Sequence, residues 1–253
     1  MPLTNYKLID DIISELSGKL KIQQQQNILA DAWKPHMKEL DTFYTDATCD
    51  ESEMRYPTDQ KLLWECVGKS YRMMCDACQR LGIHRPRTKY LGVEKANMEF
   101  GAKCNNIQVD GVSFIEKLSF NAFNEGTRLG HCIKMHKRLF GVDAKKIGGD
   151  TVYAGTANRD LCKELGIQTS FVKRGRPSAE KKREEDYVRK ELARVRATQM
   201  EGSFGTQKEH YAMRRIKARK KKTEILYIFF GIHTANAVHL AGRLAGLQET
   251  KAA

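Results

Sequence analysis

The chain has 253 residues, of which 41% are hydrophobic and 30% are charged, and its formal net charge is +13. A chain of this length can bury a sizeable core in one α/β domain, with or without a small helical appendage. Most of the excess charge lies in residues 173–222, which contain 18 Lys and Arg but only 7 Asp and Glu. Such a concentration is typical of a surface that binds a phosphate backbone, although a solvated helical surface has the same composition. We favour nucleic acid as the partner.

The first twenty residues lack the features of a membrane or export signal. They contain no apolar run long enough to span a bilayer, and Asp10 and Asp11 are not expected in a signal or transit peptide. The seven cysteines, an odd number, indicate reduced thiols. Cys75 and Cys78 have the spacing of a zinc-binding pair, but no second pair follows, which favours ordinary core or surface thiols. We therefore expect a soluble, cytoplasmic protein that has no contact with a membrane.

The first part of the chain changes from a helical to a strand pattern. Residues 5–37 carry apolar positions at helical spacing and predict a helical hairpin with its break at Gly18. Residues 41–48 are rich in aromatic and β-branched side chains and predict the first strand, which carries Asp46. Residues 58–81 then predict a long helix.

Strand signals return after residue 99. The runs 100–109 and 112–120 flank Asp110-Gly111, which is a strong signal for a tight hairpin turn. Asp110 is therefore better explained as a turn residue than as a catalytic acid. The remaining pattern predicts, in order, a helix at 127–139, a strand at 145–149, a helix at 158–165, a strand at 168–172, helices at 180–198 and 200–211, and a helix at 223–247.

This order predicts an α/β fold with a mixed five-stranded sheet flanked by helices. If the segment 58–90 is a helical insertion, the remaining elements have the ribonuclease H topology. We expect an N-terminal helical segment at 1–40, a catalytic domain at 41–247 and a tail at 248–253.

Three acidic residues are placed to aim carboxylates at one point. Asp46 lies in the first strand, Asp150 follows the fourth strand, which this topology places beside the first, and Glu201 lies on a helix that packs across their edge. Three converging carboxylates can hold two Mg²⁺ or Mn²⁺ ions that activate water and stabilise a leaving alkoxide. Alternatively, Asp46 and Asp150 cap a turn or helix and Glu201 is an ordinary surface residue. The pattern favours a metal-dependent nuclease or strand transferase.

Five motifs between residues 40 and 244 support this interpretation when they are taken together in chain order. They are Asp46-Ala47-Thr48-Cys49 with Tyr56-Pro57-Thr58-Asp59, then Glu99-Phe100-Gly101-Ala102-Lys103, then Asp150 with Tyr153, then Asn158-Arg159, and finally Glu201-Gly202-Ser203-Phe204-Gly205 with Lys208. Together they resemble the DDE transposases of bacterial insertion sequences, in the superfamily of insertion sequence five.

The resemblance implies a ribonuclease H-like core that cuts and rejoins DNA. Asp46, Asp150 and Glu201 would be the metal ligands, and Lys208, seven residues after the acid, would grip DNA near the cleavage site. Arg194 and Arg196 precede Glu201 at offsets that do not match the related signature, so their role is left open. The resemblance further implies a homodimer on paired transposon ends, acting on transposon and target DNA at the bacterial nucleoid.

Further basic residues are candidates for contacts with DNA phosphate, with a solvated surface as the alternative. These candidates are Lys103, Arg159, Arg214, Arg215, Lys217, Arg219, Lys220, Lys221 and Lys222.

Two departures from the family pattern leave other functions open. The segment 91–98 is shorter than the corresponding stretch of family members, and so is the N-terminal region, which indicates a shortened copy. The Gly148-Gly149 pair before Asp150 predicts a weak strand. The alternatives are a catalytically decayed transposase remnant that only binds DNA, and a ribonuclease H-like nuclease that acts on RNA.

Overall fold

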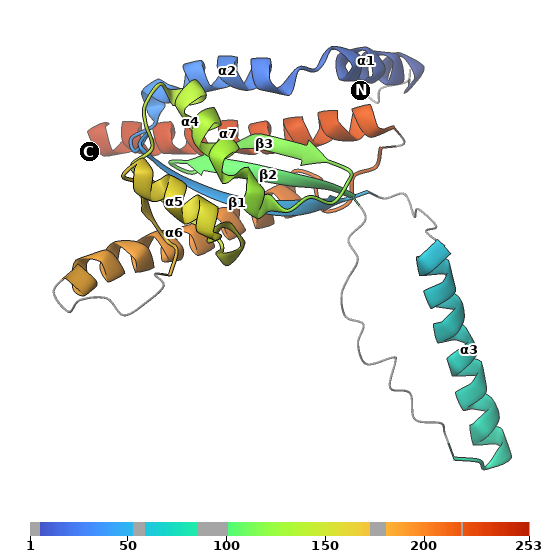
Figure 1. Ribbon diagram of the computed structural model, residues 1–253. Helices are drawn as coiled ribbons and strands as arrows, with labels where there is room; N and C mark the ends of the chain where they lie inside the picture. Colours follow the sequence, from blue (N-terminus) through green and yellow to red (C-terminus); the bar gives the residue numbers. More distant parts are fainter. Residues whose placement is uncertain (1–5, 53–58, 85–100, 173–180, 219, 253) are drawn as a thin grey trace. The chain divides into compact units, whose positions relative to one another are not determined.

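The computed structural model describes residues 6–52, 59–84, 101–172, 181–218 and 220–252 (Figure 1). The chain divides into two compact units, of which the larger comprises Met1–Glu53 with Gly101–Ala253 and the smaller comprises Met54–Phe100. The sequence Arg174-Gly175-Arg176-Pro177 also predicts a basic linker and Thr58 a helix cap, and both lie outside the described residues.

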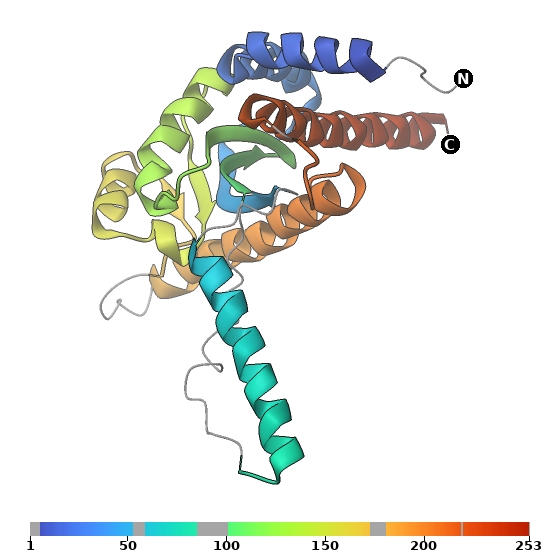
Figure 2. The ribbon, with the colours of Figure 1, turned by 90° about the vertical axis from the view of Figure 1, so that its right-hand side faces the viewer.

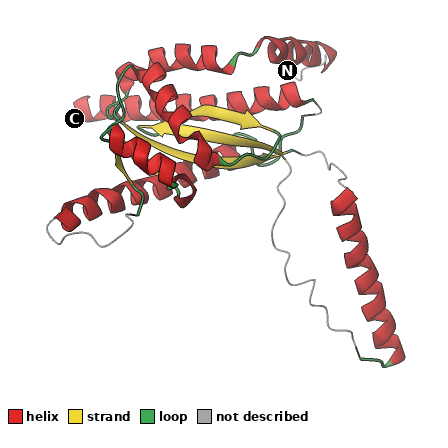
Figure 3. Cartoon of the chain, in the orientation of Figure 1, coloured by secondary structure: helices red, strands yellow, loops and turns green. Residues whose placement is uncertain are grey.

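The larger unit is built on a sheet with helices packed around it (Figure 3). The sheet is mixed and has five strands in the order β3-β2-β1-β4-β5. The strands are β1 (Thr42–Glu51), β2 (Gly101–Val109), β3 (Val112–Ser119), β4 (Lys146–Gly149) and β5 (Gln168–Thr169). Strands β1, β2 and β3 pair antiparallel, whereas β4 pairs parallel with both β1 and β5. The predicted α/β class, the mixed sheet and the adjacency of the first and fourth strands are confirmed.

The turn between β2 and β3 is the predicted tight hairpin. Asp110 and Gly111 have φ angles of 47° and 82°, the left-handed conformation that such two-residue turns need. The Asp110 carboxylate also accepts a hydrogen bond from the Arg243 guanidinium at 2.8 Å. Asp110 is thus a turn residue with a structural partner.

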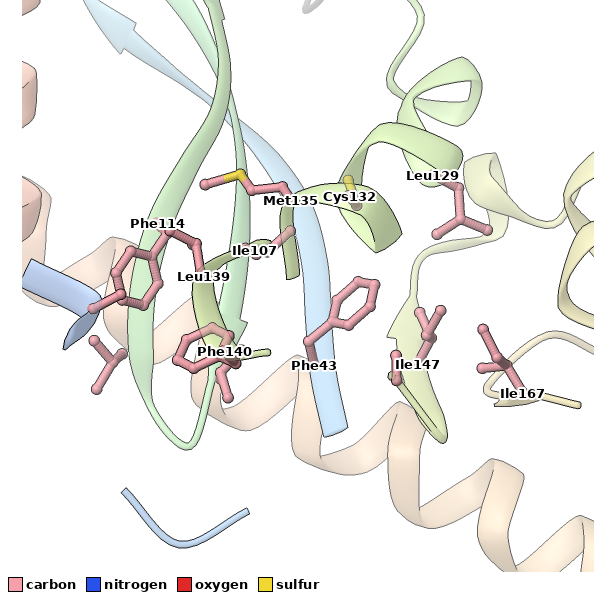
Figure 4. Close-up of a cluster of buried hydrophobic side chains, with 14 of the residues drawn as sticks. Phe43, Ile107, Phe114, Leu129, Cys132, Met135, Leu139, Phe140, Ile147 and Ile167 are labelled. Atoms are coloured by element: carbon pink, nitrogen blue, oxygen red, sulfur yellow. The ribbon is translucent and has the colours of Figure 1, made fainter. Parts of the chain in front are cut away.

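One face of the sheet packs against α2 (Ile22–Trp33) and α4 (Leu129–Phe140). Phe43, Ile107 and Ile147 come from three neighbouring strands and meet Met135 and Leu139 of α4 in one buried cluster (Figure 4). Helix α4 ends at Gly141, whose φ of 74° supplies the left-handed cap. The short helix α5 (Thr156–Glu164) joins β4 to β5.

The opposite face packs against one long helix, and a second long helix packs on the edge strand β3. Helix α6 (Lys181–His210) contacts β1, β4 and β5, and α7 (Lys221–Ala252) contacts β3. Because side chains alternate along a strand, Phe43 and Thr45 of β1 face α4 whereas Tyr44 and Asp46 face α6. This alternation decides on which face of the sheet the candidate site lies.

The N-terminal segment forms two helices, as predicted, but with different partners. Helix α1 (Tyr6–Lys19) lies along α7, as Figure 2 shows, whereas α2 packs on α4. The break falls at Leu20 and Lys21, and Gly18 lies within α1. Packing of α1 and α2 on each other as a hairpin stays a prediction.

Two predictions of helix boundaries near the C-terminus differ from the structure. The separate helices at 180–198 and 200–211 are one continuous helix, α6, because Met200 is fully buried at the predicted break and holds the helix against the sheet. The helix predicted at 223–247 runs from Lys221 to Ala252.

Residues Lys221–Gly246 of α7 are long and apolar enough to cross a membrane when judged by length and composition alone. Core helices of soluble proteins pass the same test, and 44% of the most apolar stretch is buried inside this structure. Ile228 and Ile232 of α7 belong to a buried cluster with Ile115 of β3. We therefore interpret α7 as a core helix.

The smaller unit contains α3 (Asp59–Leu81), which Gly82 ends with a φ of 66° as predicted. Apolar side chains such as Leu63, Val67 and Met73 are exposed on this helix. Cys75 and Cys78 lie on it as free thiols.

The fold contains a buried histidine that should make its stability depend on pH. His233 of α7 packs against the rings of Trp33, Phe114 and Phe229, and burial lowers its pKa from 6.5 to about 3. Below pH 6.5 the unfolded chain therefore binds a proton that the folded chain excludes, and stability falls as the pH falls toward 3.

We expect the free energy of unfolding to fall by about 1.4 kcal/mol per pH unit below 6.5 from this group. Urea unfolding of wild type and His233→Gln at pH 7 and pH 5 measures this, and the variant should lose less stability on acidification. His131→Gln, at an exposed position on α4, should behave as wild type. An equal loss of unfolding free energy between pH 7 and pH 5 in wild type and His233→Gln would show that His233 does not cause the pH dependence.

Candidate active site

The parallel pairing of β1 and β4 places Asp46 beside Asp150. The last paired residues are Thr45 and Gly149, Asp46 follows Thr45 within β1, and Asp150 is the first residue after β4. Paired residues of neighbouring strands point to the same face, which here is the face covered by α6. Burial raises the pKa of the Asp46 carboxyl, and the nearby Asp150 charge acts in the same direction, whereas the Ala47 amide and Arg196 oppose it. Two of the three predicted acids are therefore neighbours.

Both carboxylate oxygens of Asp46 accept hydrogen bonds. The Ala47 backbone amide donates to Oδ1 at 2.9 Å, and the guanidinium Nη1 of Arg196 donates to Oδ2 at 2.5 Å. The Asp46 and Arg196 side chains are 20% and 17% exposed, so the ion pair is largely withdrawn from solvent. A charge-assisted hydrogen bond in such a setting is stronger than one on an open surface.

Asp150 serves as the cap of a short helical turn, η3 (Thr151–Tyr153). Its Oδ1 accepts the Thr151 backbone amide at 2.6 Å. The capping role that the sequence left as an alternative is therefore present. It fixes the direction of the Asp150 side chain beside Asp46, so capping and a ligand role are compatible.

Glu201 is not grouped with the acid pair. It is exposed on α6, whereas Met200 beside it is fully buried. Five residues separate Glu201 from Arg196, which corresponds to about 140° around an α-helix. Because Arg196 points at Asp46, Glu201 points largely away from the sheet. Its role as a ligand shared with Asp46 and Asp150 stays a prediction.

Asp46 and Asp150 form a donor set that suits a single Mg²⁺ or Mn²⁺ ion. Mg²⁺ typically takes one or two carboxylates and completes its shell with water and substrate phosphate. A second ion needs a further carboxylate, and among the described residues no three His, Cys, Asp or Glu side chains are grouped to hold a metal. The pair fits one ion once Oδ2 of Asp46 is released from Arg196.

A buried polar network supports the pair from the opposite face of the sheet. The Tyr153 hydroxyl donates to Oδ1 of Asn105 at 2.5 Å, and Thr45 Oγ1 donates to the Asn106 carbonyl at 3.0 Å. Burial raises the pKa of the Tyr153 hydroxyl well above its usual range. These contacts tie β1 to β2 and anchor the turn that follows Asp150. Tyr153 thus acts in positioning, on the face away from Asp46.

Two of the predicted DNA-contacting cations are used inside the fold. The Lys103 ammonium donates to the Phe123 carbonyl at 3.1 Å and pairs with the Glu125 carboxylate. Arg159 Nε donates to the Ala154 carbonyl at 2.7 Å, and its guanidinium lies 5.8 Å from the centre of the Phe171 ring. The structure gives both side chains a structural role, and their contact with phosphate stays a prediction.

The segment after α6 presents basic side chains beside the strand that carries Asp46. The Ile216 amide donates to the Glu51 carbonyl at 2.8 Å, which attaches the segment to the end of β1. Ile216 and Ala218 are buried, whereas Arg215 and Lys217 are exposed. The predicted basic surface therefore includes a short, anchored strip on the same unit as the acid pair.

The other predicted cations lie near this strip. Lys208 is partly exposed on α6, and Arg214 pairs with Glu209 at 3.1 Å. Lys220, Lys221 and Lys222 are exposed at the start of α7, and Arg219 lies outside the described residues.

Sequence reasoning left the role of Arg196 open. A signal was present, because Leu192 and Met200, each one helical turn away, are apolar and buried, so a cation between them has to meet a partner on the sheet. The identity of that partner depends on tertiary packing.

Comparison with known families bears on this region. Residues 147–233, about a third of the chain, match the family described as "Transposase DDE domain". This segment is similar to a DDE transposase domain. It runs from β4 through Asp150 and α6 into α7, and it supports the interpretation of the chain as a DDE transposase. No curated protein and no solved structure matches the chain.

The Gly148-Gly149 pair has a packing role that the sequence did not reveal. A Cβ atom at Gly148 would lie 2.3 Å from Cδ1 of Tyr44 and 3.2 Å from the Leu192 carbonyl oxygen. The expectation that this pair weakens the strand overlooked this, because the missing side chain lets Tyr44 and α6 approach β4.

We expect Gly148→Ala to lower the free energy of unfolding by about 1 to 3 kcal/mol, the usual cost of overpacking. Gly202→Ala on α6 is the control, since no atom lies within 4 Å of its added Cβ. It should be neutral or stabilising by up to about 1 kcal/mol, because Ala favours helices. Urea unfolding compares the two, and equal effects would show that α6 does not pack closely over Gly148.

Proposed function

We propose that the protein is a transposase that cleaves and transfers DNA strands at the Asp46 and Asp150 pair. The observation that carries this proposal is the β1 and β4 register, which aligns two carboxylates from residues about a hundred positions apart in the sequence. The family match over the segment that contains Asp150 supports the same reaction.

The chain's residues would act by binding and orientation. Asp46 and Asp150 hold a divalent ion, and the Thr151 amide keeps the Asp150 carboxylate in place. When bound, a divalent ion would lower the pKa of an attacking water or 3′-hydroxyl, and in the two-ion form a second ion would stabilise the leaving 3′-oxygen. No side-chain nucleophile is required.

The finer form of the proposal keeps Glu201 as the third acid of a two-ion, ribonuclease H-like site, on the strength of the family resemblance. In that form α6 has to turn or shift so that Glu201 faces the pair. The proposed partners are transposon ends and target DNA, the proposed assembly is a homodimer, and the proposed location is the bacterial cytoplasm at the nucleoid.

DNA binding without cleavage is the second candidate function, and a specific observation favours it. Arg196 occupies an oxygen of Asp46 that an ion would need, and the described residues lack a three-acid group. A transposase remnant that only binds DNA would have these properties.

A cleavage assay with Mn²⁺ and duplex DNA separates these functions. We expect Asp150→Asn to reduce strand cleavage by more than about a hundredfold, beyond the loss typical of groups outside the ligand shell. The asparagine oxygen can still cap η3, so the variant should fold and, without divalent ions, bind DNA as wild type does. Asp160→Asn, at an exposed position on α5, is the matched control and should cleave normally.

Undiminished cleavage by Asp150→Asn would overturn the assignment of the acid pair. In the same assay, loss of cleavage by Glu201→Gln would support the two-ion form, and normal cleavage would remove Glu201 from the site. Binding of DNA by wild type without any cleavage would establish the second candidate function.

The strip of Arg215 and Lys217 should bind DNA phosphates. We expect the double change to Gln to weaken DNA binding and to reduce the slope of log affinity against log salt by about 0.9 for each phosphate that is no longer neutralised. Lys137→Gln with Lys163→Gln removes two exposed cations from α4 and α5 and should leave the slope unchanged. Fluorescence anisotropy with a labelled duplex at several salt concentrations measures the affinity and the slope for each protein. If the Arg215 and Lys217 double variant had the same slope as wild type, the strip would be excluded from the DNA surface.

A further inference from the structure

Arg196 is set apart from its neighbour Arg194 by the partner that it binds. Arg194 is exposed and pairs with Glu191 on its own helix at 2.7 Å. Arg196 instead reaches from α6 to the sheet and binds Asp46, a residue 150 positions earlier in the chain. This bond links the helix to one of the two acids of the proposed site.

The guanidinium and a divalent ion compete for one oxygen atom. Oδ1 of Asp46 already accepts the Ala47 amide, and Oδ2 accepts Arg196. An ion shared by Asp46 and Asp150 would lie close to the guanidinium on Oδ2, so the two cations repel each other and compete for the charge of the same carboxylate. The guanidinium is more easily moved than the Ala47 amide, because it stands at the end of a long flexible side chain and the amide is part of the strand.

A second donor lies next to Asp46 with nothing in the described structure to receive its hydrogens. Asn106 of β2 is directly opposite Asp46 in the sheet and is fully buried. Its Oδ1 accepts the Cys104 thiol at 3.2 Å, which orients the amide, and its Nδ2 has no hydrogen-bond partner among the described residues. Directly opposite residues have Cβ atoms about 4.5 to 5.5 Å apart, so this amide borders the space around the Asp46 carboxylate.

A guanidinium and an amide can donate hydrogen bonds to the oxygens of a phosphodiester, while the two carboxylates beside them can hold a divalent ion. Guanidinium binds phosphate in the same forked geometry in which it binds carboxylate, so a DNA phosphate is a direct substitute for Asp46. The negative charge that the guanidinium leaves on Asp46 then favours a divalent cation.

We propose that Arg196 exchanges Asp46 for a DNA phosphate, so that DNA binding releases Asp46 to bind the divalent ion. The inference rests on the proposed function, since it concerns the regulation of the same site. It gives the protein a metal site that is weak until substrate DNA is bound. By thermodynamic linkage, the ion must then strengthen DNA binding by the same factor.

The test measures Mn²⁺ affinity by the electron paramagnetic resonance signal of the free ion, with and without a 20-base-pair duplex, after subtraction of the ion bound by the duplex alone. For wild type we expect the duplex to raise the affinity of the protein for Mn²⁺ by roughly tenfold, within the usual range of coupling between sites. Arg196→Gln should bind Mn²⁺ more tightly than wild type without DNA, and the duplex should then add little.

Two further variants separate exchange from a general effect of charge or folding. Arg194→Gln removes an equal charge from the same helix and should retain the wild-type coupling. Arg196→Lys keeps a cation opposite Asp46 and should retain a reduced coupling, so a folding defect in Arg196→Gln does not leave the question open. Thermal melting confirms that each variant is folded.

The inference is overturned if Arg196→Gln shows the same gain from DNA as wild type, or if wild type binds Mn²⁺ equally with and without the duplex. Coupling without strand cleavage would overturn the proposed function and support the inference. Strand cleavage without any coupling between DNA and Mn²⁺ would support the proposed function and overturn the inference about Arg196.

Discussion

The parallel pairing of β1 with β4 is the constraint on which the rest of the site depends. It brings Asp46 and Asp150 together, because each follows the last paired residue of its strand, Thr45 in β1 and Gly149 in β4. Two neighbouring negative charges raise the free energy of the folded chain unless a cation lies between or beside them. In the described structure that cation is the guanidinium of Arg196. The proposed chemistry uses the same need for positive charge to bind a metal ion.

Helix α6 supplies this cation because it packs closely on β1 and β4. Gly148 lacks the side chain that would collide with Tyr44, and Tyr44 in turn packs with Leu192 and Met200 of α6. On the opposite face, buried hydrogen bonds from the Thr45 and Tyr153 hydroxyls to β2 hold β1 and the turn after Asp150 in place. The acid pair thus sits between a packed helix and a rigid network. Such support is what a site needs to keep its ligands in place.

Local sequence signals predicted the parts of the fold that local chemistry decides. The Asp110-Gly111 turn, the end of α3 at Gly82 and the strand that carries Asp46 follow from backbone preferences of a few residues. The neighbouring positions of Asp46 and Asp150 followed from the order of strands and helices.

What the sequence did not reveal depends on packing between distant segments. The sequence predicted a break between residues 198 and 200, but burial of Met200 keeps α6 continuous. The direction in which Glu201 points is fixed by which face of α6 meets the sheet. The partner of Arg196 lies 150 residues away in the sequence. Strand propensity alone made Gly148 look unfavourable, whereas in the structure its missing side chain leaves room for the Tyr44 ring. No local pattern carries this information.

The central claim is that Asp46 and Asp150 together hold a divalent ion. A crystal of the full chain with bound duplex DNA, soaked in Mn²⁺ and measured at the manganese absorption edge, tests it most directly. The account predicts an anomalous peak within ligand distance of both carboxylates, with the Arg196 guanidinium moved onto a phosphate. A peak elsewhere, or none at an Mn²⁺ concentration that supports strand cleavage, would contradict it.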